Sequence, residues 1–251
     1  TYVSEVGRPV LNGINFNLYA GEVLGIAGVE GNGQTELVEI MTGLRKAAGG
    51  EIIVYDQNIA GNNPRDTRML NISHIPEDRL TNGVAVRSSI KENLIVDRYF
   101  RKPFKKGIFL NKKEIDGSTN ELIQQFGIKT PNGDLPVSSL SGGNMQKVVV
   151  AREFSSNPYI LIASQPTRGI DVGATEFIRE QLVVKRTEGT AVLLVSADLG
   201  EVMSLSDRII TLYEGKVTGV FPDASQVTEE QLGTYMLGVN QMTPEEMEAK
   251  L

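Results

Sequence analysis

The sequence contains no cysteine and a single histidine among its 251 residues. Without cysteine the chain can form no disulfide bond, no thiolate metal site and no cysteine nucleophile, which agrees with a reducing compartment. His74 has no second histidine and no cysteine with which to share a metal ion. We therefore interpret it as a residue on the face of a strand rather than as a metal ligand.

Long apolar runs and a basic charge balance are also missing. No run approaches the roughly 18 apolar residues that a membrane-spanning helix needs. The formal net charge is −6, so we expect no nucleic acid among the partners. The first residues are not typical of a signal peptide and include no initiator methionine, so we expect the chain to be a piece of a longer protein or to have been trimmed.

One residue is missing from an otherwise complete phosphate-binding pattern. The glycine-rich loop 28–35 follows an apolar run, 23–27, and precedes a helical pattern, 36–41; such loops require this context of strand, loop and helix. Every fixed position of G-x-x-x-x-G-K-[ST] is present except the lysine, which is Gln34. Gln34 brings no charge to the β- and γ-phosphates, whereas Thr35 keeps the hydroxyl that would ligate Mg²⁺. On this loop alone, a tight glycine turn without a ligand is an equal alternative.

Apolar runs alternate with helical patterns along the chain, which indicates an α/β fold with parallel strands. Strands are expected in 1–27 (interrupted by a turn at 20–22), 51–55, 71–76, 159–163, 190–195, 207–213 and 216–221. Helices are expected in 34–41, 141–154, 173–188, 199–203 and 228–237. The tail from Gln241 is acidic and is expected to be loose. Ligands of such sheets bind beyond the carboxyl ends of the strands. The glycine loop, Ser164-Gln165 and Ser196-Ala197 all follow strands, which favours a nucleotide site over an empty turn.

The middle of the chain, 80–139, carries apolar residues at helical spacing and is interpreted as a helical insertion. Within it, segment 98–106 is basic and interleaved with aromatic residues. One interpretation is a patch for nucleic acid or lipid headgroups. The other, which we prefer, is a solvated loop of the insertion.

A second helix N-terminus follows the insertion. Leu140 is followed by Ser141, Gly142 and Gly143, and a helical pattern then runs to about residue 154. Small residues at a helix N-terminus leave backbone N–H groups accessible, so this is a second potential phosphate site.

These motifs together resemble the ATP-binding cassette (ABC) family of transporter ATPases over nearly the whole chain. The LSGG sequence at 140–143, downstream of a phosphate-binding loop, is the most specific of them. The resemblance implies one domain over 1–240, followed by an acidic tail, 241–251. The implied fold is α/β: a P-loop NTPase (RecA-like) core with a mixed, mainly parallel sheet, an antiparallel β-subdomain and a helical subdomain at about 80–155.

The resemblance also assigns roles to individual positions. It implies that the following residues contact nucleotide in the Walker A region: Gly28, Glu30, Gly31, Asn32, Gly33, Gln34, Thr35 and Glu36. It implies that the following residues contact the partner's ATP: Leu140, Ser141, Gly142, Gly143, Asn144 and Gln146. Single positions are implied for the Q-loop (Glu77), the Walker B aspartate (Ser164), the catalytic glutamate (Gln165), the D-loop (Asp171), the switch histidine (Ala197) and, weakly, the adenine-stacking aromatic (Tyr2).

Four groups that carry charge or transfer protons in the family are thus neutral here, at positions 34, 164, 165 and 197. Because phosphoryl transfer depends on positioning and electrostatics, we expect this domain's own site to hydrolyse little or no ATP. Binding of ATP or ADP with Mg²⁺ is expected to be weak or absent there, with Thr35 as a weak Mg²⁺ ligand. Family cassettes dimerise head to tail, so the intact signature implies that this domain completes the ATP site of a partner cassette.

The finer resemblance is to the second cassette of tandem sugar and nucleoside importers, carried by 76–79 and 163–174 and closest to the nucleoside branch. It implies as partners an N-terminal cassette of the same chain, transmembrane permease subunits and, indirectly, a solute-binding protein. The implied location is peripheral, at the cytoplasmic face of the membrane. Two alternatives remain: a nucleotide-binding regulatory or structural module without a transport role, and an active ATPase that uses unusual residues.

Overall fold

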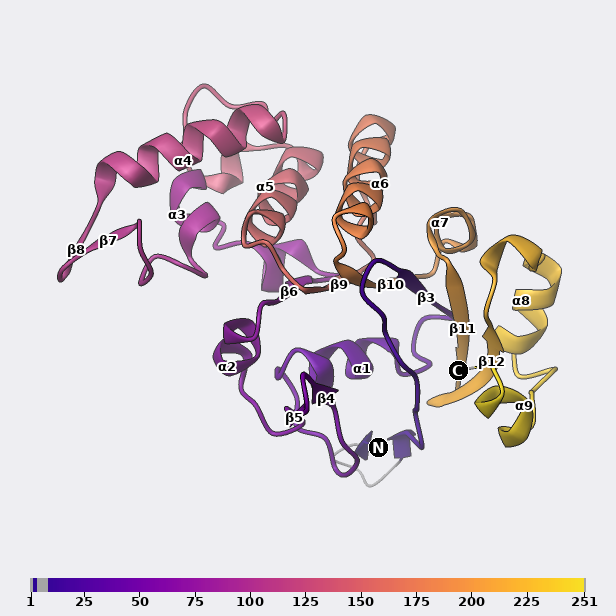
Figure 1. Ribbon diagram of the computed structural model, residues 1–251. Coiled ribbons are helices and arrows are strands. Elements are labelled where there is room, and N and C mark those ends of the chain that lie inside the picture. The colour runs from indigo at the N-terminus through magenta and orange to yellow at the C-terminus, as the bar shows by residue number, and fades with distance from the viewer. Residues whose placement is uncertain (1, 4–8, 251) are drawn as a thin grey trace. The chain divides into compact units, whose positions relative to one another are not determined.

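The computed structural model describes residues 2–3 and 9–250 (Figure 1). The chain divides into two compact units. The first consists of Thr1–His74, Tyr159–Gln165 and Leu182–Leu251, and the second of Ile75–Pro158 and Pro166–Gln181.

The first unit is built around a six-stranded sheet in the order β12-β11-β3-β10-β9-β6. Its strands are β3 (Val23–Gly28), β6 (Ile72–Ile75), β9 (Ile160–Ser164), β10 (Ala191–Ser196), β11 (Arg208–Tyr213) and β12 (Lys216–Phe221). The inner strands β11, β3, β10 and β9 are parallel, and β12 is antiparallel to β11. The predicted α/β class, with a mixed and mainly parallel sheet, is therefore confirmed.

The register of the sheet brings three strand ends to one edge. Ser196 of β10 pairs with Ala27 of β3, and Val195 pairs with Ser164 of β9. Because these strands are parallel, the residues that follow them emerge side by side. The glycine loop, Gln165 and Ala197 therefore start from the same edge, as the sequence predicted.

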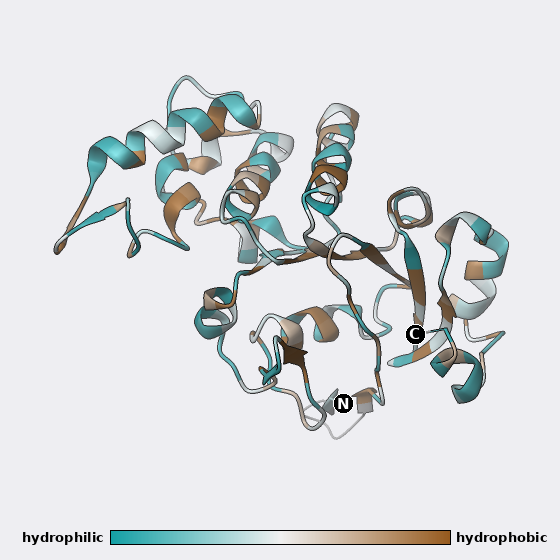
Figure 2. Ribbon diagram, viewed as in Figure 1, coloured by the Kyte–Doolittle hydropathy of each residue, from teal (hydrophilic) through white to brown (hydrophobic). Residues whose placement is uncertain are grey.

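Both faces of the sheet are covered, which explains why its central strands β3, β9 and β10 are largely apolar runs; these strands are mainly brown in Figure 2. On one face, Leu24 and Ile26 of β3 pack in a cluster with Leu37 and Val38 of α1 (Gln34–Met41). The residue that follows on β3, Ala27, belongs to the cluster on the other face. Alternate side chains of a strand point to opposite faces, so β3 is held between two layers of helices.

Helix α7 (Leu199–Leu205) approaches β3 so closely that only glycine fits at position 25. A Cβ on Gly25 would lie 2.7 Å from the Cγ1 of Val202 and would also overlap the side chain of Ser206. The close contact fixes α7, and with it the loop that joins β10 to α7.

The remaining elements of the first unit are short. They are β1 (Tyr2–Val3), β2 (Pro9–Leu11), β4 (Ile53–Val54), β5 (Gln57–Asn58), α2 (Pro64–Met69), η3 (Ala224–Gln226), α8 (Glu229–Met236) and α9 (Pro244–Glu248). Strands β1 and β2, and strands β4 and β5, form antiparallel pairs. The expected strand at 51–55 is thus only two residues long.

Two sequence-based predictions are wrong in this unit. Residues 12–19 were expected to continue as strand, but they form none, although Ile14, Phe16 and Leu18 pack against the core as their alternation implies. The tail was expected to be loose, but it contains α9. Thr243 and Glu246 form a capping box there, and Met242 is buried. The alternation of apolar residues at 14, 16 and 18 predicted their burial correctly. A strand also needs a neighbouring strand with which to form hydrogen bonds, and the alternation does not show whether one is present.

The second unit is mainly helical and contains the predicted insertion. Its elements are η1 (Arg79–Gly83), α3 (Ile90–Ile95), β7 (Lys105–Lys106), β8 (Phe109–Leu110), α4 (Lys112–Gln125), η2 (Val137–Ser139), α5 (Gly142–Ser155) and the first part of α6 (Val172–Thr187). Phe126 makes edge-to-face contacts with Phe154 of α5 and Phe177 of α6. Among the described residues, no helix in either unit is long and apolar enough to cross a membrane.

Candidate nucleotide site and signature helix

The glycine loop connects the end of β3 to the start of α1, as predicted. Gly31 (φ 90°) and Gly33 (φ 100°) adopt the left-handed conformation that favours glycine. Gly33 is also the N-cap of α1 and has no side chain with which to cap the helix. Glycine therefore suits both of these positions of the loop.

The side chain of Gln34 is buried against the end of β3. Gln34 is 7% exposed. A Cβ added at Gly28 would overlap the amide nitrogen of Gln34 and would lie 2.9 Å from the carbonyl oxygen of Leu212. The amide therefore fills space beside the sheet without adding charge to the cradle.

The shape of the loop is held by the turn between β11 and β12. The N–H of Glu214 donates to Oδ1 of Asn32 (3.1 Å), and the N–H of Gly215 donates to the carbonyl oxygen of Asn32 (3.1 Å). The Gly215 carbonyl in turn accepts from the N–H of Asn12 (2.8 Å). Sequence reasoning missed this support, because the partners lie more than 180 positions apart and Glu214-Gly215 is typical of any hairpin turn.

The charged residues of the loop and of the helix that follows it are acidic. Segment 28–41 contains three acidic residues, Glu30, Glu36 and Glu39, and no lysine or arginine. Of these, Glu39 pairs with Arg45 at 2.5 Å. Within segment 28–41, backbone N–H groups and the helix N-terminus are the sources of positive potential.

The positions of the catalytic glutamate and the switch histidine are joined by a hydrogen bond. Gln165 follows β9 in a left-handed conformation (φ 47°), and its N–H donates to the carbonyl oxygen of Val195 (2.7 Å). Its Oε1 accepts a hydrogen bond from the N–H of Ala197 (3.2 Å). Ser164, at the Walker B position, is 4% exposed. The structure brings all three together, and all three are neutral.

Tyr2, the weak candidate for stacking on adenine, already contacts a cation. The guanidinium carbon of Arg45 lies 4.7 Å from the centre of the Tyr2 ring, and Arg45 also donates a hydrogen bond to the Tyr2 hydroxyl. Arg45 therefore covers one face of this ring.

In the second unit, Ser141 caps the signature helix α5. Its Oγ accepts from the N–H of Asn144 (3.4 Å) and from Nδ2 of Asn144 (2.9 Å). Oδ1 of Asn144 accepts from the N–H of Lys129 (2.8 Å), and Nε2 of the buried Gln146 donates to the carbonyl oxygen of Pro166 (2.7 Å). Leu140, just before the cap, is 9% exposed. The predicted signature residues therefore form one connected helix start.

The D-loop position packs directly on the signature. A Cβ at Gly143 would lie 2.6 Å from Oδ2 of Asp171, so only glycine allows this approach. The other carboxylate oxygen of Asp171 accepts from the N–H of Ala174 at the start of α6 (2.9 Å). Asp171 thereby links the starts of α5 and α6.

Two arginine side chains lie near Glu77, at the Q-loop position. Glu77 forms an ion pair with Arg168. Arg79 donates to the carbonyl oxygens of Arg168 (2.9 Å) and Gly169 (3.2 Å), and its Nη2 lies against the backbone of Gly142. Sequence reasoning recorded Arg79 and Arg168 only as members of family-typical stretches, since their meeting depends on a fold-back of about 90 residues.

Asp78 ends this segment as the N-cap of η1. The hydroxyl of Thr81 donates to its carboxylate (2.5 Å), and the N–H groups of Leu80 and Thr81 donate as well. These donors lower the pKa of Asp78, with the Thr81 hydroxyl contributing most.

Comparison with known proteins decides the family. The family described as "ABC transporter" matches residues 11–168. This chain belongs to the ABC transporter family.

Three curated relatives match almost the whole chain. The nucleoside import ATP-binding protein NupA of Lactococcus lactis subsp. cremoris is 40% identical over 93% of this chain and 46% of its own length. The guanosine import ATP-binding protein NupO of Bacillus subtilis is 41% identical over 94% of this chain and 46% of its own. The glucose import ATP-binding protein TsgD13 of Haloferax volcanii is 40% identical over 92% and 42%. The chain thus spans about half the length of the curated relatives it matches.

Two solved structures show the same fold. The dimeric ATP-binding cassette MJ0796 in a post-hydrolysis state, bound to ADP and Pi, has a TM-score of 0.72 and 23% identity, covering 84% of this chain and 89% of its own. A nucleotide-free cassette from an ABC transporter has a TM-score of 0.73 and 20% identity, covering 100% and 95%. The cassette fold expected from the resemblance is confirmed.

Proposed function

We propose that this cassette is an importer subunit that does not hydrolyse ATP at its own Walker site and instead completes the ATP site of a partner cassette. The contrast between its two sites supports this proposal. The positions at the sheet edge that would carry charge are neutral, whereas the start of the signature helix is intact. The single observation that carries most weight is the hydrogen bond from the backbone N–H of Ala197 to Oε1 of Gln165. It brings together two residues with neutral side chains at the positions where the resemblance implies a base and a histidine.

The residues at the sheet edge do not fit Mg²⁺-ATP. The hydroxyl of Thr35 remains as a ligand, but Ser164 offers no carboxylate and Gln34 no ammonium, in a segment whose charged residues are all acidic. Divalent magnesium prefers carboxylate oxygens and phosphates. The loss of charge stabilisation at one donor alone typically lowers turnover by about 100-fold or more, so we expect no turnover above background here.

The signature helix keeps the groups that bind an anion. In both of its contacts with Asn144 the oxygen of Ser141 is the acceptor, which leaves the hydroxyl proton to donate outward. Gly142, which is half-buried, carries no side chain at the helix N-terminus, where the helix dipole favours negative charge. These groups would contact the terminal phosphate of a nucleotide held by the partner cassette.

We further propose that the imported solute is a nucleoside or a simple sugar, as the names of the relatives suggest. The partners would be a second cassette, N-terminal in the same polypeptide, and transmembrane permease subunits, with a solute-binding protein acting upstream. The chain would then lie at the cytoplasmic face of the membrane, held there by the permease.

Two measurements test the proposal. Nucleotide calorimetry and ATP turnover on this chain alone should show weak or no binding and no turnover; turnover that Gln165→Ala abolishes would overturn the first half. In the complete transporter, Ser141→Arg should block uptake, because it fills the anion site. Ser138→Arg, which alters an exposed serine of η2 outside the signature helix α5, is the matched control. Unimpaired uptake with Ser141→Arg would show that the signature does not act in trans.

The alternative is a regulatory or structural nucleotide-binding module without a transport role. It predicts tight nucleotide binding by the isolated chain and normal uptake when the signature is disrupted. The same two measurements therefore separate the alternatives.

A further inference from the structure

A small β-hairpin projects from the helical part of the second unit. Strands β7 and β8 pair antiparallel, with Gly107 and Ile108 at the tip, just before α4 (Figure 1). The N–H of Asn111 donates to the carbonyl oxygen of Phe104 (2.8 Å) and closes the base. Phe104 is buried in a small cluster with Ile95 and Ile115, so the base of the hairpin is anchored while its tip extends outward.

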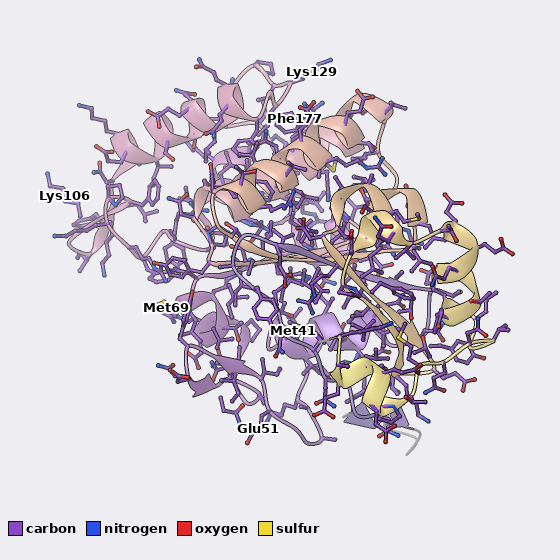
Figure 3. All side chains as sticks on the ribbon, turned by 45° about the vertical axis from the view of Figure 1, so that its right-hand side comes forward. Met41, Glu51, Met69, Lys106, Lys129 and Phe177 are labelled. Carbon is purple, nitrogen blue, oxygen red and sulfur yellow. The ribbon has the colours of Figure 1, made fainter. Side chains whose placement is uncertain are left out.

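The hairpin is strongly basic within an acidic chain. Segment 98–113 carries seven arginine and lysine residues and no acidic residue, although the chain has a net charge of −6. Its lysines are all exposed, and none has an ion-pair partner among the described residues: Lys102, Lys105, Lys106, Lys112 and Lys113. Figure 3 shows Lys106 at the outer end of the hairpin. Uncompensated charges of one sign favour an anionic partner.

The tip also exposes apolar side chains that the fold leaves unburied. Ile108 is 89% exposed, Phe109 73% and Leu110 52%. Cross-strand pairing places Lys105 opposite Leu110 and Lys106 opposite Phe109. Residues directly opposite share a face of the hairpin, so each face presents an apolar side chain beside a lysine.

We propose that this hairpin inserts into an anionic phospholipid surface. The apolar tip would enter the boundary between headgroups and acyl chains, while the long lysine side chains keep their ammonium groups among the phosphates. From Asn111 to Ile108 the strand rises about 10 Å, which matches the roughly 5–10 Å depth of interfacial insertion. A nucleic acid would use the lysines, but it would leave an aliphatic tip without a role.

The proposal goes beyond the proposed import function, since it concerns lipid contact by this chain without permease or nucleotide. The test is co-sedimentation of the 251-residue chain with vesicles of phosphatidylglycerol and phosphatidylcholine in equal parts, compared with pure phosphatidylcholine. We expect binding only to the anionic vesicles, weakened at high salt. Lys105→Glu with Lys106→Glu should lower the partition coefficient roughly tenfold or more. Ile108→Ser with Phe109→Ser should also lower it roughly tenfold.

The controls are matched for exposure and charge. Val239 is as exposed as Phe109, at 73%, so Val239→Ser controls for loss of an exposed apolar side chain. Lys46→Glu with Lys216→Glu controls for net charge at exposed lysines outside the hairpin. Circular dichroism checks that each variant is folded. If one of the two hairpin double variants fails to fold, the other one decides the test. No binding to anionic vesicles, equal losses in the controls, or tighter binding to single-stranded RNA than to vesicles would each overturn the proposal.

Discussion

The hydrogen bond between Gln165 and Ala197 can be tested by changing residue 165 alone. Gln165→Ala removes the acceptor but keeps a side chain in the left-handed conformation. A neutral hydrogen bond contributes about 0.5–1.5 kcal/mol net, so we expect the free energy of unfolding to fall by about 1 kcal/mol. Gln165→Glu keeps an acceptor oxygen, so we expect a change within about 0.5 kcal/mol.

Gln165→Gly separates the hydrogen bond from the backbone conformation. Glycine also lacks the acceptor, but it avoids the roughly 1–2 kcal/mol that a side chain costs in the left-handed region. Part of this gain, about 0.4–1 kcal/mol, is offset by the greater freedom of glycine in the unfolded chain. The glycine variant should therefore be more stable than the alanine variant by about 0.5–1 kcal/mol.

Urea unfolding followed by circular dichroism measures these differences. The expected order of stability is Gln165→Glu first, then Gln165→Gly, then Gln165→Ala. Equal stability of the alanine and glycine variants would show that the backbone at position 165 is not strained. A glutamate variant as unstable as the alanine variant would show that the contact with Ala197 is not a hydrogen bond to the side chain.

Three further predictions follow from the second unit. Gly143→Ala should clash with Asp171 and lower the free energy of unfolding by about 1–3 kcal/mol, which urea unfolding measures; Asp171→Ala in the same chain should recover part of the loss. Arg79→Met should leave two carbonyl groups without their charged donor and cost about 1–3 kcal/mol, with faster hydrogen exchange at the start of α5 as the specific sign. The N–H and hydroxyl of Ser89 lower the pKa of Glu92 below 4.5, its ordinary value, with the N–H contributing most; stability from this carboxylate is therefore present above that pH and lost as the pH falls through the lowered pKa. In Glu92→Gln the urea midpoint should change less between neutral and acidic pH, and an unchanged pH dependence would refute this linkage.

The sequence predicted the features that depend on local pattern. The continuous apolar runs gave the strands of the sheet, and the glycine loop was placed correctly between β3 and α1. The helix α9 was missed although a local signal was present: Thr243 and Glu246 at capping-box spacing, with Pro244 at the first helical position. Acidic composition was wrongly given more weight than that spacing.

Features that depend on distant partners could not be read from the sequence. The contacts of Asn32 with the β11–β12 turn and of Arg79 with Gly169 join segments whose proximity only the fold creates. The basic segment is a different case, because its charge was visible but its geometry was not. Aromatic and aliphatic residues are usually buried, so the exposure of Ile108 and Phe109 emerges only once the short hairpin is seen.

The attachment of Asn32 to the hairpin turn separates the shape of the glycine loop from its chemistry. Two hydrogen bonds that hold the loop join residue 32 to the turn at 214–215, and neither involves residue 34. This part of the loop's support therefore does not depend on the side chain at position 34. Under the proposed function, this support from a distant turn would let the cassette keep the shape of its loop as one half of a dimer without chemistry at its own site.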